Sequence, residues 1–188
     1  MKNPRRTLWL HASIFMLVIL ADQLTKYWAR VRYSLPSGEP DYYLSTPVIG
    51  EWLQFRLVYN FGAAFGTKPQ GILPFLSPTI FFLIFSVVAI ACLGYYYYKL
   101  GAKEKAARFG VLLILAGALG NLIDRMTMHK VTDFIDVGIP GFSPRWPVFN
   151  IADSSVFIGI LLMLIPPFFS SKSSGYVKPA DADNPEAA

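Results

Sequence analysis

Asparagine and aspartate recur three residues apart at two places in the 188-residue sequence, as Asn121/Asp124 and Asn150/Asp153. On a helix, this spacing would place the amide and the carboxylate on one face. The first pair ends a long apolar run and the second begins another. Carboxylates at the edge of a hydrocarbon layer are costly and by default indicate function. We therefore expect an active site within residues 121–153.

The chemistry indicated is that of a pair of carboxyl groups. Two carboxyl groups held close together cannot both ionise, so one retains a proton. The ionised group can take a proton from water while the protonated group polarises a carbonyl, as in aspartic peptidases. Other schemes have less support, because His11 and His129 are far apart and no zinc motif is present. The one cysteine, Cys92, lies inside an apolar run and has no metal-ligand spacing around it.

The sequence leaves the identity of the pair partly open. Asp153 is one member, because it begins an apolar run directly after a polar motif. Its partner is Asp124 or Asp133. Arg125 follows Asp124 and would favour a charged, structural ion pair, whereas the apolar neighbours of Asp133 would raise its pKa. Asp136 has similar neighbours but no motif, so the residues alone favour Asp133 without excluding Asp124.

The composition is that of a membrane protein with several spans. Hydrophobic residues make up 54% of the chain and charged residues only 15%, against about a quarter in typical soluble domains. The apolar residues gather in four runs, and the mean hydropathy is +0.42. The net charge of +5 comes from basic residues that flank these runs. Membrane orientation and anionic lipid therefore explain this charge better than nucleic acid does.

The apolar runs predict four transmembrane helices, at about residues 8–28, 78–98, 106–123 and 150–169. The first run is longer than a signal-peptide core and lacks a convincing cleavage site, so we expect it to be retained. Alternating residues at 52–59 predict a strand, and residues 131–137 could form another. We expect one membrane domain, residues 1–170, followed by a disordered cytoplasmic tail, residues 171–188.

The basic residues also predict the orientation. Those before the first run, those at 99–108 and those after the fourth run fall on one side. The positive-inside rule makes that side cytoplasmic, so both termini face the cytoplasm. Asp22, Asn60, Asp124 and Asp153 then converge on the outer side of the membrane. Asp22 and Lys26, four residues apart, can pair along one helix face.

Five motifs in this order resemble bacterial lipoprotein signal peptidase, also called signal peptidase II, over about residues 8–169. The motifs are Asp22-Gln23-Leu24-Thr25-Lys26, Asn60-Phe61-Gly62-Ala63-Ala64-Phe65, Gly120-Asn121-Leu122-Ile123-Asp124-Arg125, Val131-Thr132-Asp133-Phe134 and Phe149-Asn150-Ile151-Ala152-Asp153. The resemblance implies that Asp133 and Asp153 form the catalytic dyad. It implies that the other matched residues support the site or bind substrate. These are Asp22, Lys26, Asn60, Gly62, Asn121, Asp124, Arg125 and Asn150.

The resemblance also implies a fold and a function. The fold would be an all-α membrane protein with four transmembrane helices and a small extracytoplasmic antiparallel β-sheet that cradles substrate. The enzyme would cleave the signal peptide from diacylglyceryl-modified prolipoproteins just before the lipidated cysteine, in the bacterial inner membrane, near the outer leaflet. We expect no metal or other cofactor, no nucleic acid, and a monomer that contacts membrane lipid. The stretch 138–147 gives no confident alignment with the family.

Two other classes of function remain open at this point. A small ion-coupled transporter or channel could use the acids as a relay, although an inverted repeat is not evident and the acids gather on one membrane face. A non-catalytic membrane scaffold could use the same acids only to pair with Arg125 and Lys26.

Overall fold

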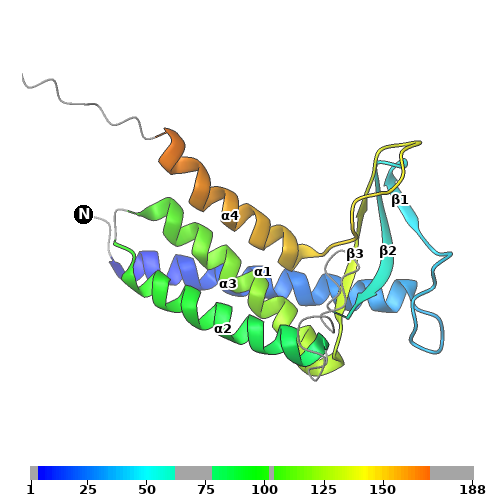
Figure 1. Cartoon of the computed structure of the whole chain (residues 1–188), viewed down its shortest axis with the longest axis horizontal. Helices are drawn as coiled ribbons and strands as arrows, with labels where there is room; N and C mark the ends of the chain where they lie inside the picture. The colour runs from blue at the N-terminus through cyan, green and yellow to red at the C-terminus, as the bar shows by residue number, and fades with distance from the viewer. Residues whose placement is uncertain (1–3, 62–77, 102–103, 170–188) are drawn as a thin grey trace, which may run out of the picture.

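The computed structural model describes residues 4–61, 78–101 and 104–169. In this part of the chain, four helices lie along one another and a three-stranded sheet lies at one end of them (Figure 1). The helices are α1 (Pro4–Tyr33), α2 (Pro78–Lys99), α3 (Lys105–Met128) and α4 (Ile151–Phe169), and the strands are β1 (Thr46–Ile49), β2 (Leu53–Asn60) and β3 (Val131–Val137). Gly62 and the predicted tail lie outside the described residues.

Two of the described helices are long and apolar enough to cross a membrane: α2 from Ile80 onward and α3. The apolar part of α4, Ile151–Leu164, is shorter. Helix α1 has 30 residues but carries charged side chains in its C-terminal half, including Asp22 and Lys26. On these measures α2 and α3 agree with two of the four predicted transmembrane helices. That α1 and α4 also cross the membrane stays a prediction.

Large apolar side chains cover the outside of the helices. Ile84 and Phe85 of α2 and Phe157 of α4 are each more than half exposed. Exposure of such a surface to water is unfavourable, whereas contact with lipid chains is not, because they are as apolar as these side chains. The helical part of the molecule is therefore built to face lipid.

Helix α3 packs against α1, α2 and α4, and its contact with α4 is the most extensive. Glycine makes this contact close, because a Cβ on Gly110 would lie 2.6 Å from the carbonyl oxygen of Gly159. Small residues allow two helices in a membrane to approach until their backbones touch. The close packing fixes the start of α4 beside the C-terminal half of α3.

The strands form an antiparallel sheet in the order β1-β2-β3. The predicted strand 131–137 coincides with β3, and the predicted strand 52–59 is β2 shifted by one residue. Beyond β3, Phe149 pairs with Ile135 in an isolated antiparallel bridge. This bridge returns the chain to the sheet directly before α4 begins.

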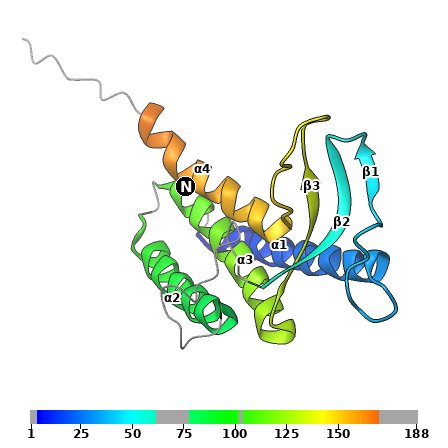
Figure 2. The same cartoon turned by 45° about the vertical axis from the view of Figure 1, so that its right-hand side comes forward.

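The sheet packs on the C-terminal part of α1, which runs past it in Figure 2. Leu57 and Phe134 are buried against Ala29 and Tyr33 of α1. Phe55 and Tyr59 join this cluster, in agreement with the predicted alternation of β2. The sheet therefore lies at the C-terminal end of α1, the half of this helix that carries Asp22, Lys26 and Arg30.

Candidate active site

Asn150 and Asp153 form a reciprocal hydrogen-bonded cap at the start of α4. The N–H of Asp153 donates to Oδ1 of Asn150 at 2.9 Å, and the N–H of Asn150 donates to Oδ2 of Asp153 at 3.3 Å. This is a capping box, which satisfies backbone donors that the first helical turn leaves free. Asn150 lies just before α4, so the shared face that this spacing would give within a helix does not apply to this pair. The Asn121/Asp124 pair does lie within one helix, α3.

Asn150 also joins Asp153 to Asp133. Its side-chain amide donates to Oδ1 of Asp133 at 2.7 Å. The other oxygen of Asp133 accepts a hydrogen bond from Asn60 at 3.2 Å, and Oδ1 of Asp153 accepts one from Asn121 at 2.8 Å. Three asparagines thus hold the two carboxyl groups, and every oxygen of both groups has a donor.

Backbone pairing brings Asn150 beside β3. Phe149 donates its N–H to Ile135 at 3.0 Å and accepts the N–H of Ile135 at 2.8 Å. The N–H of Phe134 also donates to the carbonyl of Phe149, at 3.0 Å. Because Asn150 follows Phe149 and Asp133 precedes Phe134, this pairing puts the amide next to the carboxyl group.

The surroundings of Asp133 favour its protonated form. Its side chain is buried, and the residue is only 2% exposed. Burial and, second, the nearby charge of Asp153 raise the pKa of Asp133 to about 7. Hydrogen bonds from Asn60 and Asn150 and the positive charge of Lys26 act in the opposite direction but do not cancel the effect. At neutral pH, Asp133 can therefore donate a hydrogen bond to a ligand.

Lys26 lies near the two carboxyl groups and is completely buried. Its ammonium group is 2.9 Å from Asp22 and 3.6 Å from Asp124, and it donates to Oδ1 of Asn121 at 2.9 Å. The predicted Asp22–Lys26 pair is thus present. Asn121 carries the influence of this buried charge to Asp153, since the same amide group bonds both residues.

Asp22 connects the buried ion pair to α4. Its Oδ1 accepts the N–H of Ala152 at 2.9 Å, in the first turn of α4. Gly120 leaves the room for this carboxylate, because a Cβ there would lie 2.6 Å from Oδ2 of Asp22. Helices α1, α3 and α4 are therefore joined at the site by one carboxylate and one small residue.

Over residues 14–169, the sequence matches the family model described as Signal peptidase (SPase) II. The chain belongs to the signal peptidase II family. Members of this family are membrane proteases of the bacterial inner membrane, and this chain is one of them.

Individual relatives agree with the family match. The lipoprotein signal peptidase of Staphylococcus carnosus (strain TM300) is 38% identical over 162 residues, which cover 86% of this chain and 91% of that protein. That of Psychromonas ingrahamii (strain DSM 17664 / CCUG 51855 / 37) is 35% identical over 188 residues, covering 97% and 96%.

Solved structures extend the agreement to the fold. Two structures described as a bacterial membrane enzyme solved by the in meso method superpose with TM-scores of 0.70 and 0.71. The first is 31% identical and is matched over 86% of this chain and 94% of that one. The second is 33% identical, with 90% and 94% covered.

In this signal peptidase II chain, Asp124 does not form the ion pair with Arg125 that the sequence suggested. Its ion pairs among the described residues are with Lys26 and with Arg30, at 3.9 Å, and not with Arg125. It also accepts the backbone N–H of Thr132 at 2.9 Å, which fixes α3 to the residue before Asp133. Consecutive residues of a helix point in different directions, so Arg125 and Asp124 contact different neighbours.

Arg125 instead lies on the ring of Phe82, with its guanidinium carbon 5.6 Å from the ring centroid. Its charge attracts Asp153 most strongly, then Asp133 and then Asp124. A cation near both carboxyl groups favours the form of the pair that carries negative charge.

Arg30 and Thr132 take part in the hydrogen bonds around the two carboxyl groups but were not identified from the sequence. Arg30 donates to the hydroxyl of Thr132 at 3.0 Å, and the carbonyl of Thr132 accepts the amide of Asn150 at 3.2 Å. A signal for Arg30 was present, because it follows Asp22 and Lys26 at successive four-residue steps on one face of α1. Thr132 acts largely through its backbone, which no side-chain pattern reveals.

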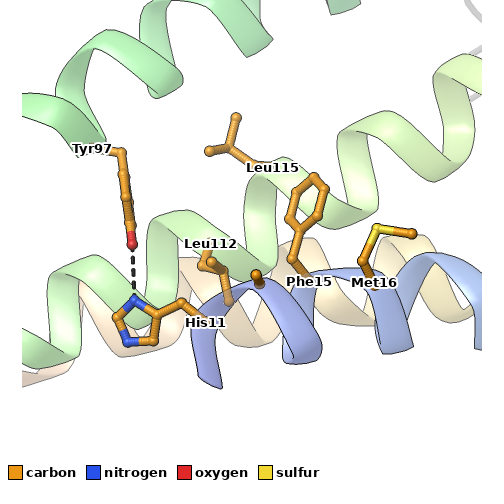
Figure 3. A pocket seen from close by; sticks show the side chains of 7 residues that line it. His11, Phe15, Met16, Tyr97, Leu112 and Leu115 are labelled. Carbon is orange, nitrogen blue, oxygen red and sulfur yellow. Dashed lines mark hydrogen bonds between the residues drawn. The ribbon is translucent and has the colours of Figure 1, made fainter. Parts of the chain in front are cut away.

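The described part of the chain also contains a cavity away from these acids. A cavity of about 280 Å³ is found between α1, α2 and α3 near the N-terminal end of α1 (Figure 3). Tyr97 and His11 lie together on one side of it and share a hydrogen bond of 2.8 Å. It is lined by His11, Ala12, Phe15, Met16, Tyr97, Leu112 and Leu115. Its lining contains no carboxyl group, so the polar cluster and not this cavity is the candidate active site.

No three His, Cys, Asp or Glu side chains are grouped to hold a metal ion in residues 4–61, 78–101 and 104–169. The carboxyl groups of the site are instead occupied by asparagine amides and by Lys26.

Replacing the buried lysine should destabilise the protein strongly. In Lys26→Met, Asp22 and Asp124 lose the ammonium group between them, and a buried ion pair that loses one partner costs about 3–5 kcal/mol. Chemical unfolding in bicelles, followed by tryptophan fluorescence, measures the change. The matched control is Lys105→Met, which replaces an exposed lysine at the start of α3 and should cost at most about 0.5 kcal/mol. Equal losses in both variants would contradict the importance assigned to Lys26.

Proposed function

We propose that Asp133 and Asp153 form the catalytic dyad of an aspartic endopeptidase that cleaves the signal peptide from diacylglyceryl-modified prolipoproteins, just before the lipidated cysteine. The observation that carries this proposal is the pair of carboxyl groups joined through Asn150, one of them with a pKa of about 7. The relatives are named lipoprotein signal peptidases, which supports the substrate class.

The two carboxyl groups divide the work of hydrolysis. Ionised Asp153 takes a proton from water as the water oxygen attacks the scissile carbonyl carbon. Protonated Asp133 donates to the carbonyl oxygen and gives it the proton as the tetrahedral intermediate forms. On collapse, the carbon–nitrogen bond breaks, the departing nitrogen takes the proton held by Asp153, and a hydroxyl of the intermediate returns its proton to Asp133. The dyad ends in its starting state.

The supporting residues keep this division in place. Asn150 and Asn60 orient Asp133, and Asn121 orients Asp153. Lys26 and Arg125 supply positive charge that keeps one carboxylate ionised inside a buried cluster. Asp22 and Asp124 neutralise Lys26 and join the helices.

The site is proposed to face the outer leaflet, with both termini in the cytoplasm. The start of α1, the end of α2 and the start of α3 lie at the end of the helices opposite the sheet. They carry the basic residues Arg5, Arg6, Lys99 and Lys105, which favour the cytoplasmic side. The sheet, the C-terminal end of α3 with Asp124 and the start of α4 with Asp153 lie at the other end. A signal helix could then lie between the helices with its lipid chains in the outer leaflet, while the sheet cradles the segment near the scissile bond.

A single copy of the chain is sufficient for this chemistry, since both acids and all three asparagines belong to it. We therefore propose a monomeric enzyme that contacts lipid and its prolipoprotein substrate and that needs no cofactor.

Amide substitution tests the dyad directly. Asp133→Asn and Asp153→Asn preserve shape but remove the proton donor or acceptor, so cleavage of a diacylated precursor should fall by at least about 10³-fold. Asp124→Asn should lower cleavage less, by loosening the site. Asp41→Asn, in the loop before β1, is the matched control and should cleave at the wild-type rate. Mass spectrometry of the products locates the cut bond. Normal cleavage by either dyad variant would overturn the assignment.

The rate should also decline on the alkaline side with a midpoint of about pH 7. Asp133 holds its proton below its pKa of about 7 and loses it above, and the proposed mechanism requires the protonated form. Initial rates of precursor cleavage from about pH 5 to about pH 9 measure this limb. Unfolding curves over the same range show that the fold persists. A rate that stays level through neutral pH would argue against a protonated Asp133.

A further inference from the structure

Asp136 forms a second buried charge cluster three residues beyond Asp133 on β3. It has no exposed surface and accepts hydrogen bonds from Gln54 at 2.9 Å, Arg56 at 2.7 Å and Arg145 at 2.8 Å. Burial alone would raise the pKa of Asp136, but hydrogen bonds from Arg145 and Gln54 and the charge of Arg56 hold it below its ordinary value. This carboxylate therefore stays charged at pH values where Asp133 is protonated.

Arg145 fastens the segment that leads into α4. Besides Asp136, its guanidinium donates to the carbonyl of Glu51 at 2.8 Å. The next residue, Trp146, donates its N–H to Val137 at the end of β3, at 3.1 Å. Three residues later, Phe149 rejoins β3 at Ile135. Hydrogen bonds to Val137 and Ile135 thus hold the end of the 138–148 loop on β3. Arg145 adds the charged contact between this loop and the sheet.

Gly138 provides the space in which this guanidinium lies. A Cβ at this position would lie 2.5 Å from Nη1 and 2.6 Å from Cζ of Arg145. The end of an arginine side chain is free to move, so a methyl group there would displace the guanidinium from Asp136 without a clash with backbone. The chain thus offers a way to open the cluster without replacing any of its charged residues.

We propose that Asp136 and Arg145 are positioning residues of the reaction, which hold the 138–148 loop on the sheet so that Asn150 and Asp153 meet Asp133. The inference rests on the proposed function. Neither residue touches the dyad, so both act through Phe149 and Asn150. We call the hydrogen-bonded pair of Asp136 and Arg145 the clamp. A charged pair suits this task, because hydrogen bonds between ionised groups are stronger than those between neutral ones.

Separation of Arg145 from Asp136 should change the pKa of Asp133, because it would move groups that face this carboxyl group. These are Asp153 of α4, Lys26 of α1, Arg125 of α3, Asn60 of β2 and Asn150. Release of the loop would move Asp153 and Asn150 and admit water beside Asp133. The two largest causes of its raised pKa, burial and the charge of Asp153, would both weaken. The hydrogen bond from Asn150, which lowers the pKa of Asp133, would weaken too but is a smaller effect, so the pKa would fall.

The test uses Arg145→Gln and Gly138→Ala in the full-length protein in lipid nanodiscs. Both variants should exchange the amide hydrogens of Phe149 and Asn150 faster than wild type, as measured by hydrogen–deuterium exchange mass spectrometry. Both should lower kcat for a diacylated precursor by about 10- to 100-fold, the effect of misplacing a reacting group, with little change in KM. The alkaline limb of the rate should shift to lower pH. Arg145→Lys should restore part of kcat.

The control is Arg32→Gln, which removes an exposed positive charge that lies on Tyr33 and not on the clamp. It should leave exchange, kcat and the pH limb as in wild type. An unchanged rate of hydrogen exchange at Phe149 in Arg145→Gln would overturn the proposal. A lower cleavage rate whose alkaline decline stays at the wild-type pH would also overturn it, because that result indicates only fewer folded molecules. Failure of the wild-type protein to cut the precursor would instead overturn the proposed function, and the positioning role with it.

Discussion

The hydrogen bonds of Asn150 are the interaction on which the site depends. One side chain accepts from the backbone of Asp153, and so starts α4, and donates to the carboxyl group of Asp133 on β3. An N-cap contributes about 1 kcal/mol, and a hydrogen bond between neutral groups contributes roughly 0.5–1.5 kcal/mol. The residue that begins a helix therefore also sets how that helix meets the sheet.

Charge balance is the second constraint. Seven ionisable groups from three helices and one strand lie together at the site, namely Asp22, Lys26, Arg30, Asp124, Arg125, Asp133 and Asp153. One buried lysine faces two of the carboxylates directly, and the dyad lies one asparagine away. Keeping Asp133 protonated lowers the negative charge that the interior must hold. The same acids lie at one end of the helices and not along their length, which distinguishes this arrangement from a proton path across the membrane.

Local sequence rules anticipated part of this arrangement. The Asp22–Lys26 pair follows from helical spacing, and both the alternation of β2 and the extent of β3 agree with the structure. The spacing of Asn150 and Asp153 was noticed but assigned to a helix face, although the same spacing is a capping-box signal. The predicted pairing of Asp124 with Arg125 was wrong because adjacent helical residues diverge.

Other parts could not be read from the sequence. Arg145 reaches Asp136 and the carbonyl of Glu51 only because the loop folds back on the sheet, and its proline- and glycine-rich sequence has no period. The bridge between Phe149 and Ile135 is a backbone contact between segments 14 residues apart, which side-chain patterns do not encode. Such contacts depend on the tertiary fold, and they are the ones that bring the two aspartates together.

The most direct test of the account is titration of the Asp133 carboxyl carbon by carbon-13 NMR, assigned by its loss in Asp133→Asn. The account predicts a pKa of about 7 in the wild-type protein and a lower value in Asp153→Asn, where the neighbouring charge is gone. A wild-type value near that of an ordinary aspartate, about 3.9, or a value that Asp153→Asn leaves unchanged, would contradict the shared-proton dyad.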